Sequence, residues 1–148
     1  MTKLFTALFA ASLLMQPVPV PDYTPSEADV TALARMAWGE ARGLADYEIA
    51  ACMWCVMNRL DHGGYGDTVQ DVVSAPGQFA GYSESNPVDE HIAAIARDVL
   101  TRHHAKQQGE TVPREIGPEY FWFSGDGVHN YFRAEYDGVG ILPKEIEK

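Results

Sequence analysis

The segment from Asp46 to Leu60 constrains the fold most, because apolar residues occupy nearly every side of a helix-length stretch. At helical spacing, one face carries Ile49, Cys52, Met53, Val56, Met57 and Leu60, and the other side carries Ala51 and Trp54. A helix that is apolar nearly all round is buried at the centre of a domain. Its two late polar residues, Asn58 and Arg59, then need hydrogen-bond partners inside the protein. The segment predicts a central helix with other elements packed around it.

Capping patterns predict three further helices. The first has Thr24 as N-cap, Pro25 at its first position and Gly43 as its left-handed C-terminal residue. The second is a short helix over 68–74, capped by Asp67. The third opens at residues 86–89 and runs to about Gln107. Asp46 is the expected N-cap of the central helix itself.

The spacing of apolar residues changes near the C-terminus. Aromatic-rich runs at 120–123 and 128–136 flank the sequence Ser-Gly-Asp-Gly, a pattern typical of a β-hairpin. We therefore predict an α+β fold class, mainly α, with a small C-terminal β-hairpin or sheet.

The first 21 residues differ from the rest. Lys3 precedes an apolar run from Leu4 to Met15, and a proline-rich stretch follows. The pattern favours a signal peptide and a stiff linker over 1–21, with an N-terminal helix or arm as the alternative. The run is too short to span a bilayer stably. We expect a secreted or cell-envelope protein whose single folded domain spans 22–148.

The chain of 148 residues carries a formal net charge of −10. Nucleic-acid affinity depends largely on Lys and Arg that neutralise phosphates, so we expect no nucleic-acid partner. The charge also gives no attraction to an anionic membrane or wall polymer. Local contacts would have to hold any such polymer.

Cys52 and Cys55 form a C-x-x-C in the middle of the central helix. Two thiols without a second suitably spaced pair do not complete a zinc site. We interpret both as small buried apolar residues, with a local disulfide as the alternative. Neither H-E-x-x-H nor G-x-S-x-G occurs, and we predict no metal and no cofactor.

Glu40 is the leading candidate for catalysis. It follows Leu33 by one heptad and so lies at the edge of the first helix's apolar stripe, where it can be partly desolvated and still face a cleft. Loss of water disfavours the charged carboxylate and favours the protonated group that a general acid needs. A solvated glutamate at a helix end is the alternative.

Three segments, in order, resemble the SleB/CwlJ-type cell wall hydrolases. They are 33–43 with the motif E-A-R-G, 49–59 ending in N-R, and the stretches 69–73 and 76–79, the last ending in G-Q-F. This resemblance covers roughly residues 30–82, and the combination is specific. The chain departs from the family at Leu44, where a second acidic residue is common, and at 46–48 with the C-x-x-C. The match thins after residue 82.

The resemblance implies a compact lysozyme-like or lytic-transglycosylase-like domain. Such enzymes cut peptidoglycan between N-acetylmuramic acid and N-acetylglucosamine, and the family's catalytic glutamate corresponds to Glu40. The family includes spore-cortex-lytic enzymes and phage lysins, and both roles stay open. The predicted partner is the glycan strand of peptidoglycan, bound by a monomer. The predicted substrate-binding residues are Asn58, Gln78, Tyr82, Tyr120, Trp122 and His129.

The chemistry depends on whether a second carboxylate faces Glu40. A hydrolase needs one as base or nucleophile, and no other acidic residue stands out in that role. A lytic transglycosylase needs a single acid and releases a 1,6-anhydro product, so we favour it. The alternatives are a hydrolytic muramidase, a non-catalytic peptidoglycan-binding module and a metal-dependent amidase or peptidase.

Overall fold

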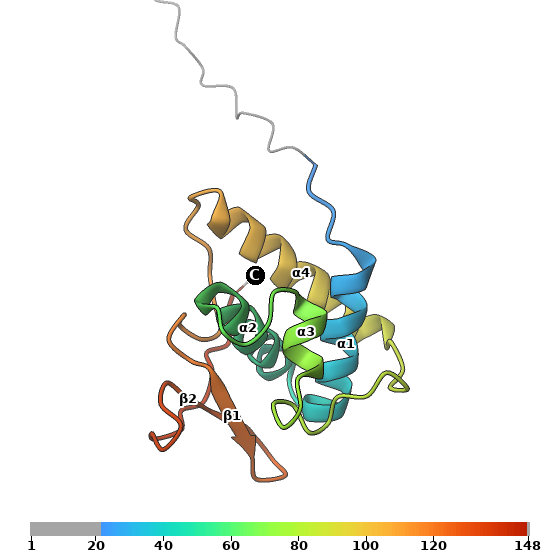
Figure 1. The fold of residues 1–148 in the computed structure, drawn as a ribbon. Helices are drawn as coiled ribbons and strands as arrows, with labels where there is room; N and C mark the ends of the chain where they lie inside the picture. The colour runs from blue at the N-terminus through green and yellow to red at the C-terminus, as the bar shows by residue number, and fades with distance from the viewer. Residues whose placement is uncertain (1–21, 148) are drawn as a thin grey trace, which may run out of the picture.

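The computed structural model describes residues 22–147, and the expected leader and linker at 1–21 lie outside them. Four helices precede a two-stranded antiparallel sheet (Figure 1). They are α1 (Glu27–Ala41), α2 (Asp46–His62), α3 (Val69–Ser74), α4 (Glu90–Gln107), β1 (Trp122–Gly125) and β2 (Asn130–Arg133). The predicted α+β fold, mainly helical with a C-terminal hairpin, is confirmed. Within 22–147, no helix is long and apolar enough to cross a membrane.

The central position of α2 is also confirmed. The helix packs against α1, α3, α4 and β1, and in Figure 1 it lies between the hairpin and α1 with α3. Its side chains Cys52, Met53 and Trp54 are fully buried. The Trp54 indole donates to Glu115 at 2.8 Å, and Arg102 binds both oxygens of that carboxylate. This network fixes the segment after α4 against the centre of the fold.

The N-caps of three helices differ from the predicted ones, and in α1 and α3 the side chain directly before the first helical residue makes the cap. Ser26, not Thr24, caps α1 by accepting from Asp29 N–H, and Thr68, not Asp67, caps α3. Asp46 is the first residue of α2 rather than its cap, and it pairs with His91. The predicted left-handed Gly43 is confirmed, with φ of +84°.

The hairpin turn lies two residues later than predicted, at 126–129. The Asp126 carboxylate accepts the backbone N–H groups of Val128 and His129, which draws the turn to that position. Phe123 pairs with Phe132 in the register. Phe132 is fully buried and the two rings are 5.4 Å apart, so this face of the hairpin packs on the core. The opposite face carries Trp122.

Candidate active site

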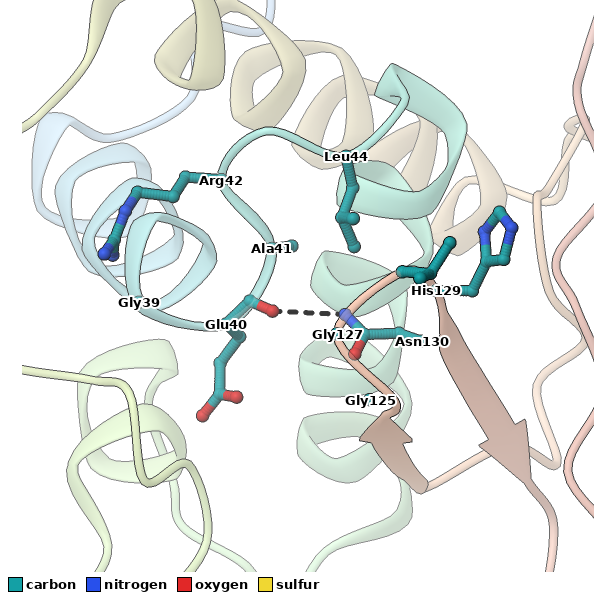
Figure 2. A pocket seen from close by; sticks show the side chains of 10 residues that line it. Gly39, Glu40, Ala41, Arg42, Leu44, Gly125, Gly127, His129 and Asn130 are labelled. Atoms are coloured by element: carbon teal, nitrogen blue, oxygen red, sulfur yellow. Dashed lines mark hydrogen bonds between the residues drawn. The ribbon is translucent and has the colours of Figure 1, made fainter.

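Glu40 lies in the last turn of α1, where it is half-buried and lines two neighbouring pockets. Its Oε1 accepts a hydrogen bond from the backbone N–H of Gly81 at 2.8 Å. Its backbone carbonyl accepts from Asn130 Nδ2 at 3.2 Å, as Figure 2 shows. The helix end is thus tied to the loop before α4 on one side and to β2 on the other, which fixes where the carboxyl group stands.

The loop that holds the Glu40 carboxyl group is fixed by Asn86. The Asn86 Nδ2 group donates to the backbone oxygens of Gly81 and Arg35, at 2.8 and 3.0 Å. Arg35 Nε in turn donates to the backbone oxygen of Asn86. These bonds hold the loop to α1, so the Gly81 N–H has a defined place.

The first pocket, here called the hairpin pocket, has a volume of about 370 Å³. Its walls are residues 39–42 and Leu44 on one side and the hairpin turn with Gly125, Gly127, Val128, His129 and Asn130 on the other. In Figure 2 the Glu40 carboxyl group points away from His129, toward the neighbouring loop, and the imidazole stands at the opposite rim. The pocket is in the size range of small-ligand sites.

The second pocket, here called the loop pocket, has a volume of about 160 Å³ and adjoins the first at Glu40. It is lined by Arg59 of α2, by Phe123 of β1 and by residues 77–80. Arg59 is buried, and burial lowers the pKa of its guanidinium group. It donates to Gln78 Oε1 at 2.6 Å and to the backbone oxygen of Phe121 at 2.7 Å. Arg59 therefore fixes one wall of the pocket.

Of the six predicted substrate-binding residues, the structure brings two to the pockets beside Glu40: Gln78 lines the loop pocket and His129 the hairpin pocket. The other four lie elsewhere. Asn58 is buried, and its Nδ2 donates to the backbone oxygens of Gly117 and Tyr120 at 3.0 and 2.9 Å. Arg114 donates to its Oδ1. These bonds are the internal partners that a polar residue on the central helix requires.

The predicted aromatic contacts are also displaced from Glu40. Tyr82 packs on the core with its hydroxyl accepting from Gln70, and Tyr120 lines a separate hollow near the C-terminal tail. Trp122 contacts the rings of Phe121 and Tyr136 on the outer face of the hairpin. Strand alternation places its neighbour Phe123, not Trp122, on the inner face that reaches the loop pocket.

Three residues beside Glu40 were missed by sequence reasoning: Gly81, Phe123 and Asn130. Asn130 carried a signal, because a polar residue at an inward position of an aromatic strand needs buried partners. It donates to the carbonyl of Glu40 and to Cys52 Sγ at 3.4 Å. The Gly81 donor had no signal in the sequence, since any residue except proline offers a backbone N–H.

A buried carboxylate, Glu48, lies in the first turn of α2 and contacts two residues that line the hairpin pocket. His129 Nδ1 lies 2.9 Å from its Oε1, and the backbone N–H of Asn130 donates to the same oxygen at 3.3 Å. The hairpin is therefore bound to α2 through Glu48 and to α1 through the bond from Asn130 to the Glu40 carbonyl.

The two cysteines are buried and free, as the interpretation of small apolar residues predicts, and the local disulfide is absent. Burial raises the pKa of Cys55 to about 12 and that of Cys52 well above its ordinary value. Across residues 22–147, no group of three or more His, Cys, Asp or Glu side chains could hold a metal ion.

Comparison with known proteins identifies the family. A family model described as Cell Wall Hydrolase matches residues 47–135, which is more than half of the chain. The match begins after Glu40, so the assignment of that residue depends on the E-A-R-G motif and on the geometry above. Comparisons with curated proteins and with solved structures gave no match. The chain belongs to the cell wall hydrolases, the family of the SleB/CwlJ catalytic domains.

Proposed function

We propose that this cell wall hydrolase cleaves the glycosidic bond between N-acetylmuramic acid and N-acetylglucosamine as a lytic transglycosylase, with Glu40 as its one catalytic group. The observation that carries the proposal is the composition of the two pockets. Among their lining residues, all within the part of the chain that the structure describes, Glu40 is the only carboxylate. A hydrolase of the usual kind needs a second carboxylate across the cleft.

The reaction uses the two protonation states of one side chain in sequence. Protonated Glu40 donates its proton to the glycosidic oxygen as the bond from that oxygen to C1 of the muramic residue breaks. The muramic 6-hydroxyl oxygen then bonds to C1, and its proton returns to the Glu40 carboxylate. The products are a 1,6-anhydro-muramic end and a free 4-hydroxyl, with no water consumed and the acid restored.

The surroundings of Glu40 suit this role. The Gly81 N–H fixes one carboxyl oxygen, and the two adjoining pockets leave room on either side of the group for a chain of sugars. Positioning of the acid against the bond that breaks supplies a large part of such catalysis. Export to the cell envelope, where the substrate lies, is part of the same proposal.

Digestion of purified peptidoglycan by the wild type and by Glu40→Gln, followed by mass spectrometry, tests the proposal. We expect loss of activity in the variant with the fold retained, and a wild-type product one water lighter than a reducing-end fragment. A reducing-end product would replace transglycosylation by muramidase chemistry. Binding without cleavage by the wild type would make the chain a wall-binding module, and full activity of Glu40→Gln would exclude Glu40 as the acid.

A further inference from the structure

Glu48 is a buried carboxylate that the proposed reaction does not use. It is 2% exposed, and a buried carboxylate is costly unless it is paired and hydrogen-bonded. Its recorded partners are the imidazole of His129 and the backbone N–H of Asn130, both on Oε1. The His129 side chain, which bonds to this carboxylate, also lines the hairpin pocket, so the Glu48–His129 pair is a candidate for a role toward the substrate.

The pairing dictates which ring nitrogen of His129 carries the proton. Oε1 of Glu48 already accepts the backbone N–H of Asn130, and an ionised carboxylate only accepts hydrogen bonds. With Glu48 ionised, the ring nitrogen that faces it, Nδ1, is therefore the donor. In the neutral ring, Nε2 then has a free lone pair. The side chain is 39% exposed at the pocket rim, on the side opposite the Glu40 carboxyl group (Figure 2). Nε2 can therefore meet a ligand away from the bond that breaks.

We propose that Glu48 is a positioning residue that holds His129 as its Nδ1–H tautomer, so that His129 Nε2 accepts a hydrogen bond from an acetamido N–H of the wall glycan. This inference depends on the proposed function, because it takes the glycan as substrate. A nitrogen restricted to accepting suits an amide N–H, which only donates. Leu44 and Val128 line the same pocket and offer apolar surface to the acetamido methyl group.

Nitrogen NMR of the histidine side chains at about pH 8 tests the tautomer without any activity measurement. We expect His129 to be protonated on Nδ1 and unprotonated on Nε2. Titration of Glu40→Gln with a soluble glycan fragment from the wall should then shift the Nε2 signal. An Nε2–H tautomer in the free protein overturns the inference, as does fragment binding that leaves Nε2 unchanged. The titration measures binding and not turnover, so a shift supports this inference even if the wild type proves not to cleave.

Kinetics on purified peptidoglycan give a second test. Asn at position 129 can present an amide donor to Glu48 but has no atom at the Nε2 position, so His129→Asn should fold normally. We expect its KM to rise roughly 3- to 10-fold, the value of one hydrogen bond, with the loss falling on KM rather than kcat. His91→Asn is the matched control, since His91 pairs with Asp46 on an exposed surface. A wild-type KM in His129→Asn overturns the contact.

A double-mutant cycle tests the role of Glu48. The amide of Glu48→Gln can either donate to or accept from Nδ1, so the tautomer is no longer enforced. We expect Glu48→Gln to raise KM, and to add nothing when it is combined with His129→Asn. Additive effects of the two substitutions would show that Glu48 does not act through His129.

Discussion

Gly39 and Gly81 contact each other backbone to backbone beside the candidate catalytic acid. A Cβ built on Gly39 would lie 1.7 Å from the carbonyl oxygen of Gly81, and one built on Gly81 would lie 2.5 Å from the carbonyl carbon of Gly39. Only glycine at both positions allows this approach. This close approach of the two backbones lets the Gly81 N–H reach the carboxyl group of Glu40, which directly follows Gly39 in the sequence.

Gly39→Ala should therefore damage both the fold and the site. The methyl group forces α1 and the loop apart, so Gly81 N–H moves away from Glu40. We expect a loss of about 1–3 kcal/mol in the free energy of unfolding and of about 100-fold in kcat. Urea unfolding and wall lysis measure the two effects. Normal activity in this variant would show that the Gly81 contact is unimportant for catalysis.

Gly43→Ala provides the comparison for this substitution. Gly43 has a φ of +84°, yet a Cβ built there meets nothing within 4 Å. Alanine there is strained by its backbone alone, at a cost of about 1 kcal/mol. We expect reduced stability with wild-type kcat, which separates backbone strain from displacement of the Gly81 donor.

Local sequence patterns predicted the elements well, because the periodicity of a helix depends on residues close in the chain, although the caps of α1, α2 and α3 lie one or two residues from the predicted ones. The burial of α2 followed from its apolar sides. The place of Glu40 at the edge of the α1 stripe predicted a partly buried side chain beside a cleft, and the structure shows it half-buried and lining a pocket. That same reasoning required internal partners for Asn58, which the structure supplies through Gly117 and Tyr120. These bonds give Asn58 a structural role on the central helix.

The contacts around Glu40 were harder to predict, because they join residues far apart in the sequence. Strand alternation shows that Trp122 and Phe123 occupy opposite faces of the hairpin, but not which face meets the helices. That choice depends on packing of the hairpin against α2, which lies at least 60 residues earlier in the chain. The paired glycines likewise become meaningful only when α1 and the loop are brought together.

Gln78→Ala should weaken substrate binding. The Gln78 Oε1 is used by Arg59 at 2.6 Å, so the Nε2 donors are what the side chain offers to a carbonyl in the loop pocket. We expect KM for peptidoglycan to rise roughly 3- to 10-fold. Gln70→Ala is the control, because Gln70 bonds to Tyr82 outside both pockets. An unchanged KM together with lower stability would mean that Gln78 serves only to hold Arg59.

Asn58→Asp should destabilise the fold without a specific effect on binding. The carboxylate cannot donate to the two backbone oxygens that Asn58 Nδ2 now serves, and it would face them with negative charge. We expect the free energy of unfolding to fall by about 2–4 kcal/mol, measured by urea titration, with KM unchanged in the folded protein. A raised KM at unaltered stability would instead support the predicted substrate contact of Asn58.

Cys52 and Cys55 should resist alkylation in the native protein. Burial raises the pKa of Cys55 to about 12 and that of Cys52 well above its usual range, and the thiolate is the reactive form. At pH 8 the Cys55 thiol is then almost entirely un-ionised, and the surrounding core blocks the reagent as well. We expect no labelling by iodoacetamide in buffer and two labels per chain in denaturant, counted by mass spectrometry. Rapid labelling of the folded protein would show that α2 opens readily, contrary to its place at the centre of the core.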